Sequence, residues 1–311
     1  MKTLLFGKDG QLGQEFISSI NSCSELLAVG KAQCDLSQPE QIQTLIHQFK
    51  PDLIINASAY TAVDLAQTES ELASLVNTQA PTVMAKEAAR LGAALVHYST
   101  DYVFDGLKKG EYTETDPCAP LSVYGQSKYL GELGVAEHCK KHLIFRTSWV
   151  FSAHGNNFLK TILKLASLKQ ELKVINDQCG APTSAALLVD STMAVLAFNG
   201  VIQGSADKVA RSNEDSHWGL FNMVASGFTN WHAYAQYLVT KAMQLGLGSG
   251  FTLDATKISA IPSKDYPQPA PRPLNSRLST EKLRTSFHIE LPEWRECVDQ
   301  ELQKIKNSQL I

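Results

Sequence analysis

Two side chains four residues apart, Tyr124 and Lys128, could perform acid–base chemistry together. They form a Y-x-x-x-K motif, and residues at this spacing share one face of a helix. A free tyrosine has a pKa of about 10, and a lysine ammonium beside it favours the phenolate, which moves the phenol towards its working range at neutral pH. The motif therefore predicts a carbonyl reductase in which Tyr124 protonates the carbonyl oxygen. A chance Tyr and Lys on one helix is the alternative.

A polar loop follows the apolar run from Ala94 to Tyr98 and supplies further candidate groups, because Thr100, Asp101 and Tyr102 all lie in it. Loops at the carboxyl edge of a parallel sheet face the ligand site. Thr100 is predicted to donate a hydrogen bond to the reacting oxygen. Asp101 is predicted to bind a sugar hydroxyl, unless it only caps the loop.

A glycine-rich loop precedes both segments. Gly7, Gly10 and Gly13 form a G-x-x-G-x-x-G pattern between an expected strand, Thr3 to Phe6, and an expected helix, Gln14 to Ile20. Glycines allow a tight turn and close approach of a pyrophosphate, which the amides at the helix start attract. In this strand–turn–helix context the loop predicts dinucleotide binding, although a plain turn has the same spacing.

The residues after the second expected strand bear on the choice of cofactor. NAD-selective sites often place a carboxylate there, whereas this chain has Gly30 and Lys31. NADPH is therefore predicted to be accepted at least as well as NADH. Asp35 and Leu36, after a presumed third short strand, are candidates for contact with adenine. Asp35 could equally serve as a helix N-cap or turn residue.

These groups would be positioned by strands and helices that alternate through roughly the first half of the chain. Apolar runs buried on both faces predict a parallel sheet. The predicted fold class is α/β, a Rossmann-type doubly wound parallel sheet with a smaller C-terminal substrate-binding domain. The expected boundaries are 1–150 for the NAD(P)-binding domain, to which some later segments return, and 151–311 for the mainly substrate-binding domain. Further expected helices and strands are Leu26 to Val29, Gln41 to Phe49, Leu53 to Asn56, Glu71 to Leu91, Lys128 to His138 and Leu143 to Phe145.

Composition excludes several classes of protein. The 311 residues carry a net charge of -3, which is a poor match for nucleic acid. No apolar run is long enough for a membrane span or a signal peptide. The six cysteines are scattered, as is typical of reduced thiols in the cytosol. A surface loop is expected at Gln203 to Ser216, and the prolines from Tyr266 to Pro273 predict a rigid wall of the second domain or a passive surface strap.

Taken together, the chain resembles the extended short-chain dehydrogenases/reductases and, among them, the dTDP-4-dehydrorhamnose reductase family. The similarity runs almost from end to end. Its superfamily marks are the glycine loop and Y-x-x-x-K, and its more specific marks are RTSWVF, NDQCGAPT and RPLNSRL. The matching segments are LLFGKDGQLG (4–13), HYSTDYVFDG (97–106), VYGQSKYLGE (123–132), LIFRTSWVF (143–151), GNNF (155–158), VINDQCGAPT (174–183) and RPLNSRLST (272–280).

The resemblance implies reduction of the C4 keto group of dTDP-4-dehydro-L-rhamnose to dTDP-L-rhamnose with NADPH or NADH, the last step of dTDP-rhamnose biosynthesis for surface polysaccharide. It also implies roles by position. The implied catalytic residues are Thr100, Tyr124 and Lys128. The implied and predicted cofactor-binding residues are Gly7, Gly10, Gln11, Leu12, Gly13, Gly30, Lys31, Asp35, Leu36, Ala59, Tyr60 and Thr61, the last three in the turn after the fourth strand, with Tyr124 and Lys128.

The sugar nucleotide is expected to meet a second set of residues. Trp149 offers a flat face for the sugar ring, although a tryptophan at a strand end is often plain packing. Arg272, Asn275 and Arg277 are candidates for the diphosphate. The full predicted set for substrate binding is Thr100, Asp101, Tyr102, Trp149, Asn157, Arg272, Asn275 and Arg277.

Other interpretations remain open at this stage. The chain could be a regulatory homologue that binds a nucleotide without catalysis, similar to the regulatory subunit of methionine adenosyltransferase. Alternatively, the substrate could be another nucleotide 4-keto sugar. A homodimer is possible. Some relatives bridge subunits through magnesium, but Ser184, Ala185 and Ala186 stand where an acidic residue is expected, so magnesium is doubtful. His138 and His142 lack accompanying ligands, and no metal site is predicted.

Overall fold

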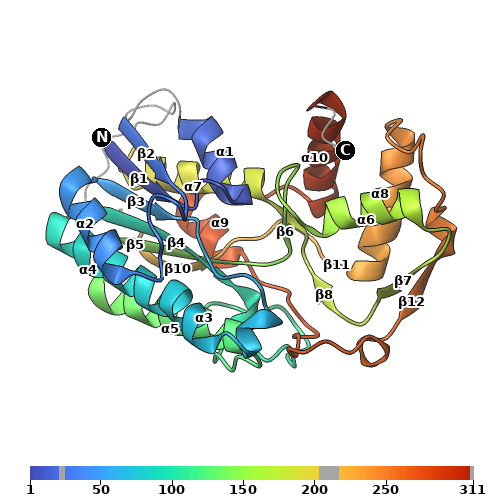
Figure 1. The fold of residues 1–311 in the computed structure, drawn as a ribbon, viewed down its shortest axis with the longest axis horizontal. Helices are drawn as coiled ribbons and strands as arrows, with labels where there is room; N and C mark the ends of the chain where they lie inside the picture. The colour runs from blue at the N-terminus through green and yellow to red at the C-terminus, as the bar shows by residue number, and fades with distance from the viewer. Residues whose placement is uncertain (21–24, 203–216, 309–311) are drawn as a thin grey trace.

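The structure is a computed structural model that describes residues 1–20, 25–202 and 217–308, so the predicted loop from Gln203 to Ser216 lies outside the described residues. One end of the molecule, here called the sheet half, contains a central sheet with helices on both faces (Figure 1). The other end, the distal half, contains further helices and short strand pairs (Figure 1). Among the described residues no helix is both long and apolar enough to cross a membrane.

The central sheet has six strands in the order β10-β5-β4-β3-β1-β2, and every neighbouring pair is parallel. This confirms the predicted Rossmann-type parallel sheet. The order reverses between β1 and β3, and ligands bind at such a switch point in open α/β sheets. The strands are β1 (Lys2–Phe6), β2 (Glu25–Val29), β3 (Leu53–Asn56), β4 (Ala94–Thr100), β5 (His142–Thr147) and β10 (Gly219–Asn222).

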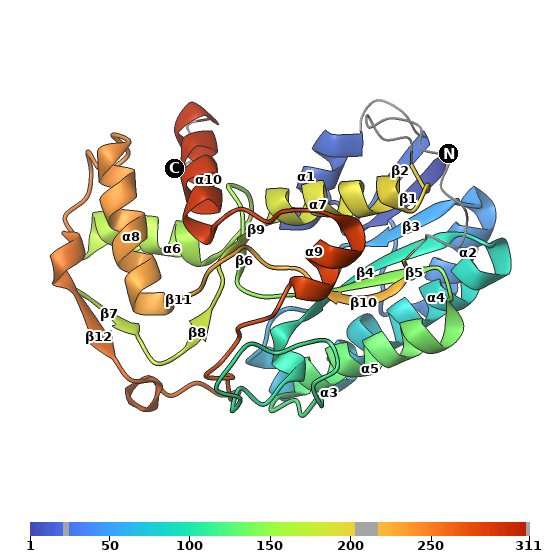
Figure 2. The same cartoon turned by 180° about the vertical axis from the view of Figure 1, so that it is seen from behind.

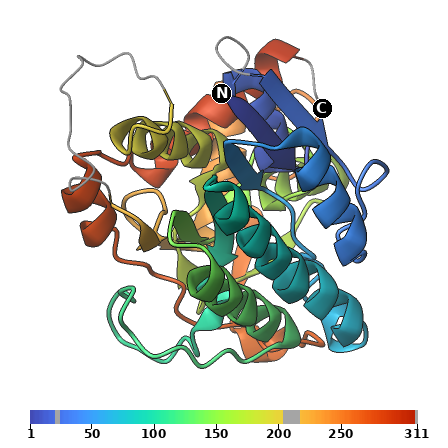
Figure 3. The same cartoon turned by 90° about the vertical axis from the view of Figure 1, so that its left-hand side faces the viewer.

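The strands are apolar because each of their faces is covered by helices. Successive residues point to opposite faces: Leu5 and Ile55 belong to one buried cluster, whereas Leu4 and Ile54 belong to the other. Helices α1 and α7 pack together on one side, and α2, α4 and α5 pack side by side on the other (Figures 1 and 3). These helices are α1 (Gln11–Ile20), α2 (Pro39–Phe49), α4 (Ala80–Leu91), α5 (Val123–His138) and α7 (Ala185–Phe198).

The presumed third strand before Asp35 is wrong. After β2 the amides of Gln33 and Cys34 both donate to the carbonyl of Gly30, which forms a turn. The Asp35 carboxylate then accepts bonds from the amide and hydroxyl of Ser37, at 2.9 and 2.8 Å. Local side-chain bonds of this kind compete with strand formation. The loop of residues 59–61 therefore follows the third strand of the chain, not the fourth.

The predicted long helix at 71–91 contains a distortion. It begins as α3 (Ser70–Ser74), passes through a π-helical turn, η2 (Leu75–Gln79), and continues as α4. Pro81 has no amide hydrogen to bond the carbonyl of Asn77, so the regular helical pattern is interrupted there. The freed carbonyl lies against α5, where a Cβ on Gly131 would be only 2.1 Å from it.

The distal half is built mainly from later residues. Helix α6 packs against α8, and three short strand pairs join segments far apart in sequence. Two later elements return to the sheet half: β10 extends the sheet beside β5, and α7 covers α1. From behind, α9 lies near β10 and below α7 (Figure 2). The remaining elements are α6 (Phe158–Leu168), β6 (Val150–Phe151), β7 (Leu172–Ile175), β8 (Cys179–Gly180), β9 (Thr183–Ser184), β11 (Thr229–Asn230), α8 (Trp231–Gln244), β12 (Ile258–Ile261), α9 (Glu281–Phe287), α10 (Trp294–Ser308) and the 3-10 turns η1 (Leu65–Gln67), η3 (Asp101–Val103), η5 (Ala255–Lys257) and η6 (Ser263–Asp265).

Candidate active site

The Y-x-x-x-K motif lies in the first turns of α5. This helix begins at Val123, five residues before its predicted start at Lys128. Ser122 caps α5, because its hydroxyl accepts a bond from the amide of Gly125. Gly125 also permits close packing, since a Cβ there would lie 2.2 Å from the carbonyl oxygen of Tyr102. The helix is thereby held against the loop that leaves β4, which brings Tyr124 to Thr100.

Thr100 and Tyr124 form the centre of the site. The Thr100 hydroxyl lies close enough to the Tyr124 phenol to lower its pKa in part, and the ring of Tyr102 meets that of Tyr124 edge to face at 5.5 Å. Burial of the hydroxyl raises the pKa of Tyr124 to about 12, which outweighs the lowering by Thr100. Lys128 is not among the groups that shift this pKa, and its ammonium is bonded to the Tyr98 carbonyl. Tyr124 is therefore protonated at neutral pH and can donate a proton.

Lys128 is buried beneath the site. Its ammonium donates to the carbonyl of Tyr98 at 2.6 Å and lies 3.4 Å from Nε2 of His97. Burial lowers the pKa of Lys128 to about 8, against the raising effect of Glu132. With one donor fixed by the backbone, the ammonium retains donors for ligand hydroxyl groups.

Asp101 adds a carboxylate that is not fully used by the protein. It is 1% exposed, and Oδ1 accepts a bond from the Thr100 hydroxyl at 3.0 Å. Among the described residues, Oδ2 has no partner with hydrogen-bond geometry, although the Ser276 side chain lies close enough to the carboxylate to lower its pKa in part. Burial raises the pKa of Asp101 to about 6. An unpaired buried oxygen is costly, so this atom is suited to accept a bond from a ligand hydroxyl.

The glycine loop has the shape that a dinucleotide requires. Gly7 has a φ of +92°, and a Cβ there would lie 2.8 Å from the Ala57 carbonyl carbon. A Cβ on Gly13 would lie 2.0 Å from the Gly7 oxygen, so only glycine allows the loop to close on α1. Gly10 instead leaves space, since a Cβ there would lie 3.4 Å from the nearest atom, the Gly7 carbonyl oxygen. Space above tightly packed backbone at a helix start fits a pyrophosphate.

Other predicted cofactor residues lie around this loop. Leu12 begins α1 beside Gln11, whose side-chain oxygen accepts a bond from Asn157 at 2.9 Å. Asn157, predicted to bind substrate, is thus placed at the cofactor loop and caps α6. Leu36 is buried in the core, and Asp35 forms the turn described above.

Sequence reasoning missed a carboxylate at the end of β2. Asp9 of the glycine loop approaches Gly30 so closely that a Cβ on Gly30 would meet its Oδ2 at 1.8 Å. The exposed Lys31 follows directly. The end of β2, which was predicted to lack a carboxylate, therefore has the Asp9 carboxylate of the glycine loop beside it. No spacing rule within the strand could reveal it, because the loop folds back onto β2.

Asn77 was also missed. It is 1% exposed, and its amide group bonds both the amide and the carbonyl of Tyr60, at 2.8 and 3.0 Å. It also donates to the Ser127 hydroxyl at 3.0 Å. Asn77 therefore ties the loop of Ala59, Tyr60 and Thr61 to the catalytic helix. A polar residue inside an otherwise apolar helical pattern was the available signal.

Trp149 follows the end of β5, two residues after Thr147, which pairs with Thr100 in the sheet. Its φ is +50°, an uncommon conformation for a bulky residue. One face of its indole stacks on Trp231, with ring centroids 3.6 Å apart and an angle of 14° between the planes. Trp231 was not predicted from the sequence.

The three predicted diphosphate residues do not come together. Arg272 forms two bonds with the carboxylate of Asp64, at 2.7 and 2.8 Å. Asn275 donates to the carbonyls of Lys108 and Gly110 and accepts from Arg277. Asn275 and Arg277 therefore hold a loop, while Arg272 lies near Tyr102, where its charge opposes the rise in pKa that burial causes.

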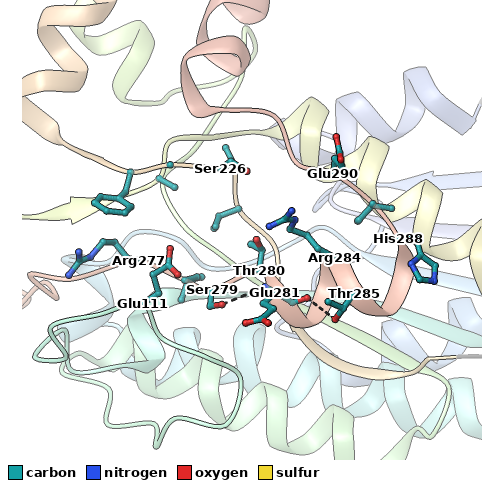
Figure 4. Close-up of a pocket in the computed structure, with 17 residues that line it drawn as sticks. Glu111, Ser226, Arg277, Ser279, Thr280, Glu281, Arg284, Thr285, His288 and Glu290 are labelled. Atoms are coloured by element: carbon teal, nitrogen blue, oxygen red, sulfur yellow. Dashed lines mark hydrogen bonds between the residues drawn. The ribbon is translucent and has the colours of Figure 1, made fainter.

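Arg277 faces a separate cavity of about 790 Å³. It is bordered by α9 and by the segments before and after it, where Arg284, Glu281 and Glu290 carry both signs of charge (Figure 4). None of Thr100, Tyr124, Lys128 or Arg272 lines this cavity. The candidate catalytic residues therefore lie outside this cavity, at the carboxyl ends of β4 and β5. Across the described part of the chain no cluster of side chains suited to a metal ion occurs.

Comparison with known proteins gives consistent matches over the whole chain. The family model described as "RmlD substrate binding domain" matches residues 1–307. The dTDP-4-dehydrorhamnose reductase of Salmonella typhimurium is 45% identical over 298 residues, 94% of each chain. Among solved structures, the dTDP-4-dehydrorhamnose reductase of Clostridium acetobutylicum has a TM-score of 0.87 at 30% identity, covering 98% of this chain and 100% of that one. The Bacillus anthracis enzyme of that name, solved with NADP, has a TM-score of 0.85 at 28% identity, with 97% and 99% covered.

Proposed function

The chain belongs to the dTDP-4-dehydrorhamnose reductase family, and on that premise we propose that it reduces the C4 keto group of dTDP-4-dehydro-L-rhamnose to the alcohol of dTDP-L-rhamnose. It is an NAD(P)H-dependent oxidoreductase of dTDP-rhamnose biosynthesis. The observation that carries the proposal is the grouping of the Thr100 hydroxyl, the Tyr124 phenol and the buried Lys128 ammonium at the carboxyl end of β4.

Different residues of the chain have different roles around the C4 oxygen. The dihydronicotinamide, when bound, supplies the hydride that C4 receives. Tyr124 gives its phenolic proton to the oxygen, and a pKa of about 12 keeps that proton available. The Thr100 hydroxyl, which donates to Oδ1 of Asp101 in this structure, is proposed to turn its single proton to the same oxygen, so that two donors stabilise the negative charge that develops there.

The remaining residues orient the ligands. Lys128 is proposed to bind ribose hydroxyls of the cofactor, since one of its donors is already fixed on Tyr98. The unpaired Oδ2 of Asp101 is proposed to accept a bond from a sugar hydroxyl. Gly7, Gly10 and Gly13 are proposed to hold the pyrophosphate, and Arg272 to address the substrate diphosphate.

The proposed cofactor preference is NADPH at least equal to NADH. Lys31 beside Gly30 supports this, because its ammonium can attract a 2′-phosphate at the end of β2. Asp9 opposes it, since its carboxylate lies against Gly30. Replacing Asp9 with Asn should therefore raise kcat/KM for NADPH relative to NADH in steady-state kinetics. A wild-type preference for NADH above about tenfold, some 1.4 kcal/mol, would overturn the proposal.

The decisive experiment is product analysis after incubation with dTDP-4-dehydro-L-rhamnose and each cofactor. Formation of dTDP-L-rhamnose with one cofactor oxidised per product is the expected result. If the cofactor is not consumed, the chain is a non-catalytic relative. If another dTDP-4-keto-6-deoxysugar reacts faster, the family chemistry holds but the substrate assignment fails.

A further inference from the structure

Buried polar side chains connect the end of β3 to Lys128. Asn56 is the strand partner of His97 in the β3–β4 ladder, and both residues are 1% exposed. The amide nitrogen of Asn56 lies 3.1 Å from Nδ1 of His97, and Nε2 of the same ring lies 3.4 Å from Nζ of Lys128. A buried network of this kind has a definite direction of hydrogen bonding only if one of its members is fixed from outside.

The backbone amide of Ser58 fixes the Asn56 carboxamide. It donates to Oδ1 of Asn56 at 3.1 Å, so the amide nitrogen Nδ2 faces the histidine ring. Because this group is only a donor, Nδ1 of His97 must accept and carries no proton. Burial, and after it the charge of Lys128 and that of His142, holds the pKa of His97 well below its usual range, so the ring is neutral. Its single proton therefore lies on Nε2.

The His97 ring thus presents an N–H, and not a lone pair, to Lys128. An ammonium group has three donors and no acceptor, so it cannot bond this N–H, whereas a neutral amine can accept from it. Among the described residues, the Tyr98 carbonyl is then the only acceptor within hydrogen-bond distance of Nζ, at 2.6 Å. Two donors of a charged Lys128 therefore have no protein acceptor, although this residue is only 2% exposed.

The other groups packed around Lys128 do not supply the missing acceptors. On the same helix, the charge of Glu132 raises the pKa of Lys128 in part, but both Glu132 oxygens bond Arg146 of β5, at 2.9 and 2.6 Å. From the η2 turn, the buried side chain is the uncharged Asn77, which donates to Ser127 and to the Tyr60 carbonyl. The titratable group from β4 is His97 itself.

We propose that Asn56 and His97 are positioning residues that turn a ring N–H towards Lys128, so that its free ammonium donors find acceptors only in the hydroxyl groups of a bound cofactor. This inference rests on the proposed function, in which Lys128 binds ribose hydroxyls. It adds the residues that leave those donors free, and it implies that cofactor binding favours the charged form of the lysine.

The first test determines the tautomer of His97 in the wild-type protein without ligand. Nitrogen–proton correlation spectra of protein labelled at its histidine nitrogens show which ring nitrogen carries the proton. The signal that is missing from His97→Gln identifies the ring. The expected result is a proton on Nε2 and none on Nδ1 at neutral pH. A proton on Nδ1 would overturn the inference, because Nε2 would then accept a bond from Lys128.

The second test counts the protons taken up from solvent when NADPH binds. Burial leaves Lys128 with a pKa of about 8, and hydroxyl groups that accept from the ammonium should raise it. At about pH 8.5 the uptake should therefore be close to three-quarters of a proton per NADPH, the neutral fraction of such a group. A phosphate monoester is already ionised at this pH. Calorimetry in buffers with different heats of ionisation measures the uptake, and Lys128→Met should abolish it.

The third test reverses the hydrogen bonds with Asn56→Asp. A carboxylate accepts from Ser58 and also from Nδ1 of His97, so Nε2 becomes an acceptor for the ammonium. The uptake should fall below about a fifth of a proton, because Lys128 is already charged. The alkaline limb of the kcat/KM profile should move up by about one pH unit. Asn307→Asp, the same replacement at an exposed position of α10, is the matched control and should change neither.

Three further results would contradict the inference. These are a wild-type protein that takes up no proton, an uptake that persists in Lys128→Met, or an unchanged uptake in a folded Asn56→Asp protein. If Asn56→Asp does not fold, His97→Gln replaces it, because its carboxamide oxygen can accept from the ammonium, and an unchanged uptake there would count equally against the inference. A failure of the proposed function would look different: no dTDP-L-rhamnose would form, while the tautomer and the proton uptake could still be measured.

Discussion

Burial sets the protonation of the three groups around the reacting carbonyl. It raises the pKa of Tyr124 to about 12, lowers that of Lys128 to about 8 and raises that of Asp101 to about 6. Between pH 6 and 8 the phenol therefore keeps its proton, the amine is charged and the carboxylate is ionised. This combination suits a proton donor, a cofactor hydroxyl ligand and a sugar hydroxyl acceptor, respectively.

Replacing Tyr124 with Phe removes the proton donor and little else. Turnover should fall at least about 100-fold, the typical contribution of a positioned acid. NADPH affinity, measured by fluorescence titration, should change less than about threefold, since Lys128 and the glycine loop remain. Near-normal turnover would remove Tyr124 from the mechanism, and Tyr266→Phe at an exposed position is the control.

The pH profile of kcat/KM should be bell-shaped, with limbs near pH 6 and 8. As pH falls through about 6, Asp101 gains a proton and loses its role as an acceptor. As pH rises through about 8, Lys128 loses its charge. Asp101→Asn, which is neutral at every pH, should lower kcat/KM and flatten the acidic limb while the alkaline limb stays. An unchanged acidic limb in this variant would exclude Asp101 as its cause.

At the scale of elements, glycines determine how closely the loops approach the helices. Gly13 lets α1 begin against the Gly7 carbonyl, and Gly125 and Gly131 let α5 pack on the loop after β4 and on the π-helical turn. These contacts involve backbone atoms, which cannot move as a side-chain end can. The positions of Tyr124 and of the cofactor loop thus depend on the absence of side chains.

Gly13→Ala should damage both folding and cofactor binding. The new methyl would lie 2.0 Å from the Gly7 oxygen, and overpacking of this kind costs about 1–3 kcal/mol. The melting temperature should fall by several degrees, and NADPH binding should weaken in the same samples. Gly250→Ala, where a Cβ would meet nothing within 4 Å, should change neither. Equal behaviour of the two variants would contradict the packing argument.

Much of this arrangement could be predicted because local pattern and environment agree. Runs such as Leu53 to Ile55 are apolar at successive positions, and the structure buries these side chains on both faces of the sheet. The glycine loop and the Y-x-x-x-K motif are local as well. The predicted strand before Asp35 failed because short polar side chains there bond their own backbone, an option that apolar periodicity does not register.

Residues that act across long sequence distances were not predictable in the same way. Asp9 lies against Gly30 because the glycine loop folds back onto β2, and Asn77 bonds a loop to α5. Trp231 stacks on Trp149, although the two residues are 82 positions apart in the sequence. Each of these pairings exists only after the chain has folded. For Arg272 the residue type was informative, but its pairing with Asp64 was not foreseeable.

At the scale of the whole molecule, the Asp64–Arg272 pair joins two segments that are 208 residues apart in the sequence. Asp64 follows β3 in the sheet half, and Arg272 belongs to the proline-rich strap, whose Ala270 amide also donates to Asp64 at 3.0 Å. The strap is therefore fastened to the sheet half and does not lie passively on the surface. The predicted domain boundary near residue 150 remains a prediction. The later elements α7 and β10 pack with the sheet half, although they follow that boundary in the sequence.

Asp64→Asn should weaken the orientation of Arg272 more than the fold. Both side chains are partly exposed, so the ion pair contributes at most about 1 kcal/mol and the melting temperature should change little. KM for the keto sugar should rise on the order of tenfold, the effect of misplacing one charge-assisted bond to the diphosphate. Asp265→Asn, directly before the strap, is the control. A large fall in melting temperature with unchanged KM would assign the pair a purely structural role.

The late arrival of β10 has a consequence for biosynthesis. Its four residues, 219–222, complete the edge beside β5, and the Asn222 side chain donates to the carbonyls of Tyr112 and Ser279. While the chain emerges from the ribosome, β5 must wait for about 70 further residues before its open hydrogen-bonding edge is covered, and longer before the Ser279 contact forms. Nascent chains stalled within that interval carry a ready template for pairing with one another, so translation speed across this region should affect the yield of native enzyme.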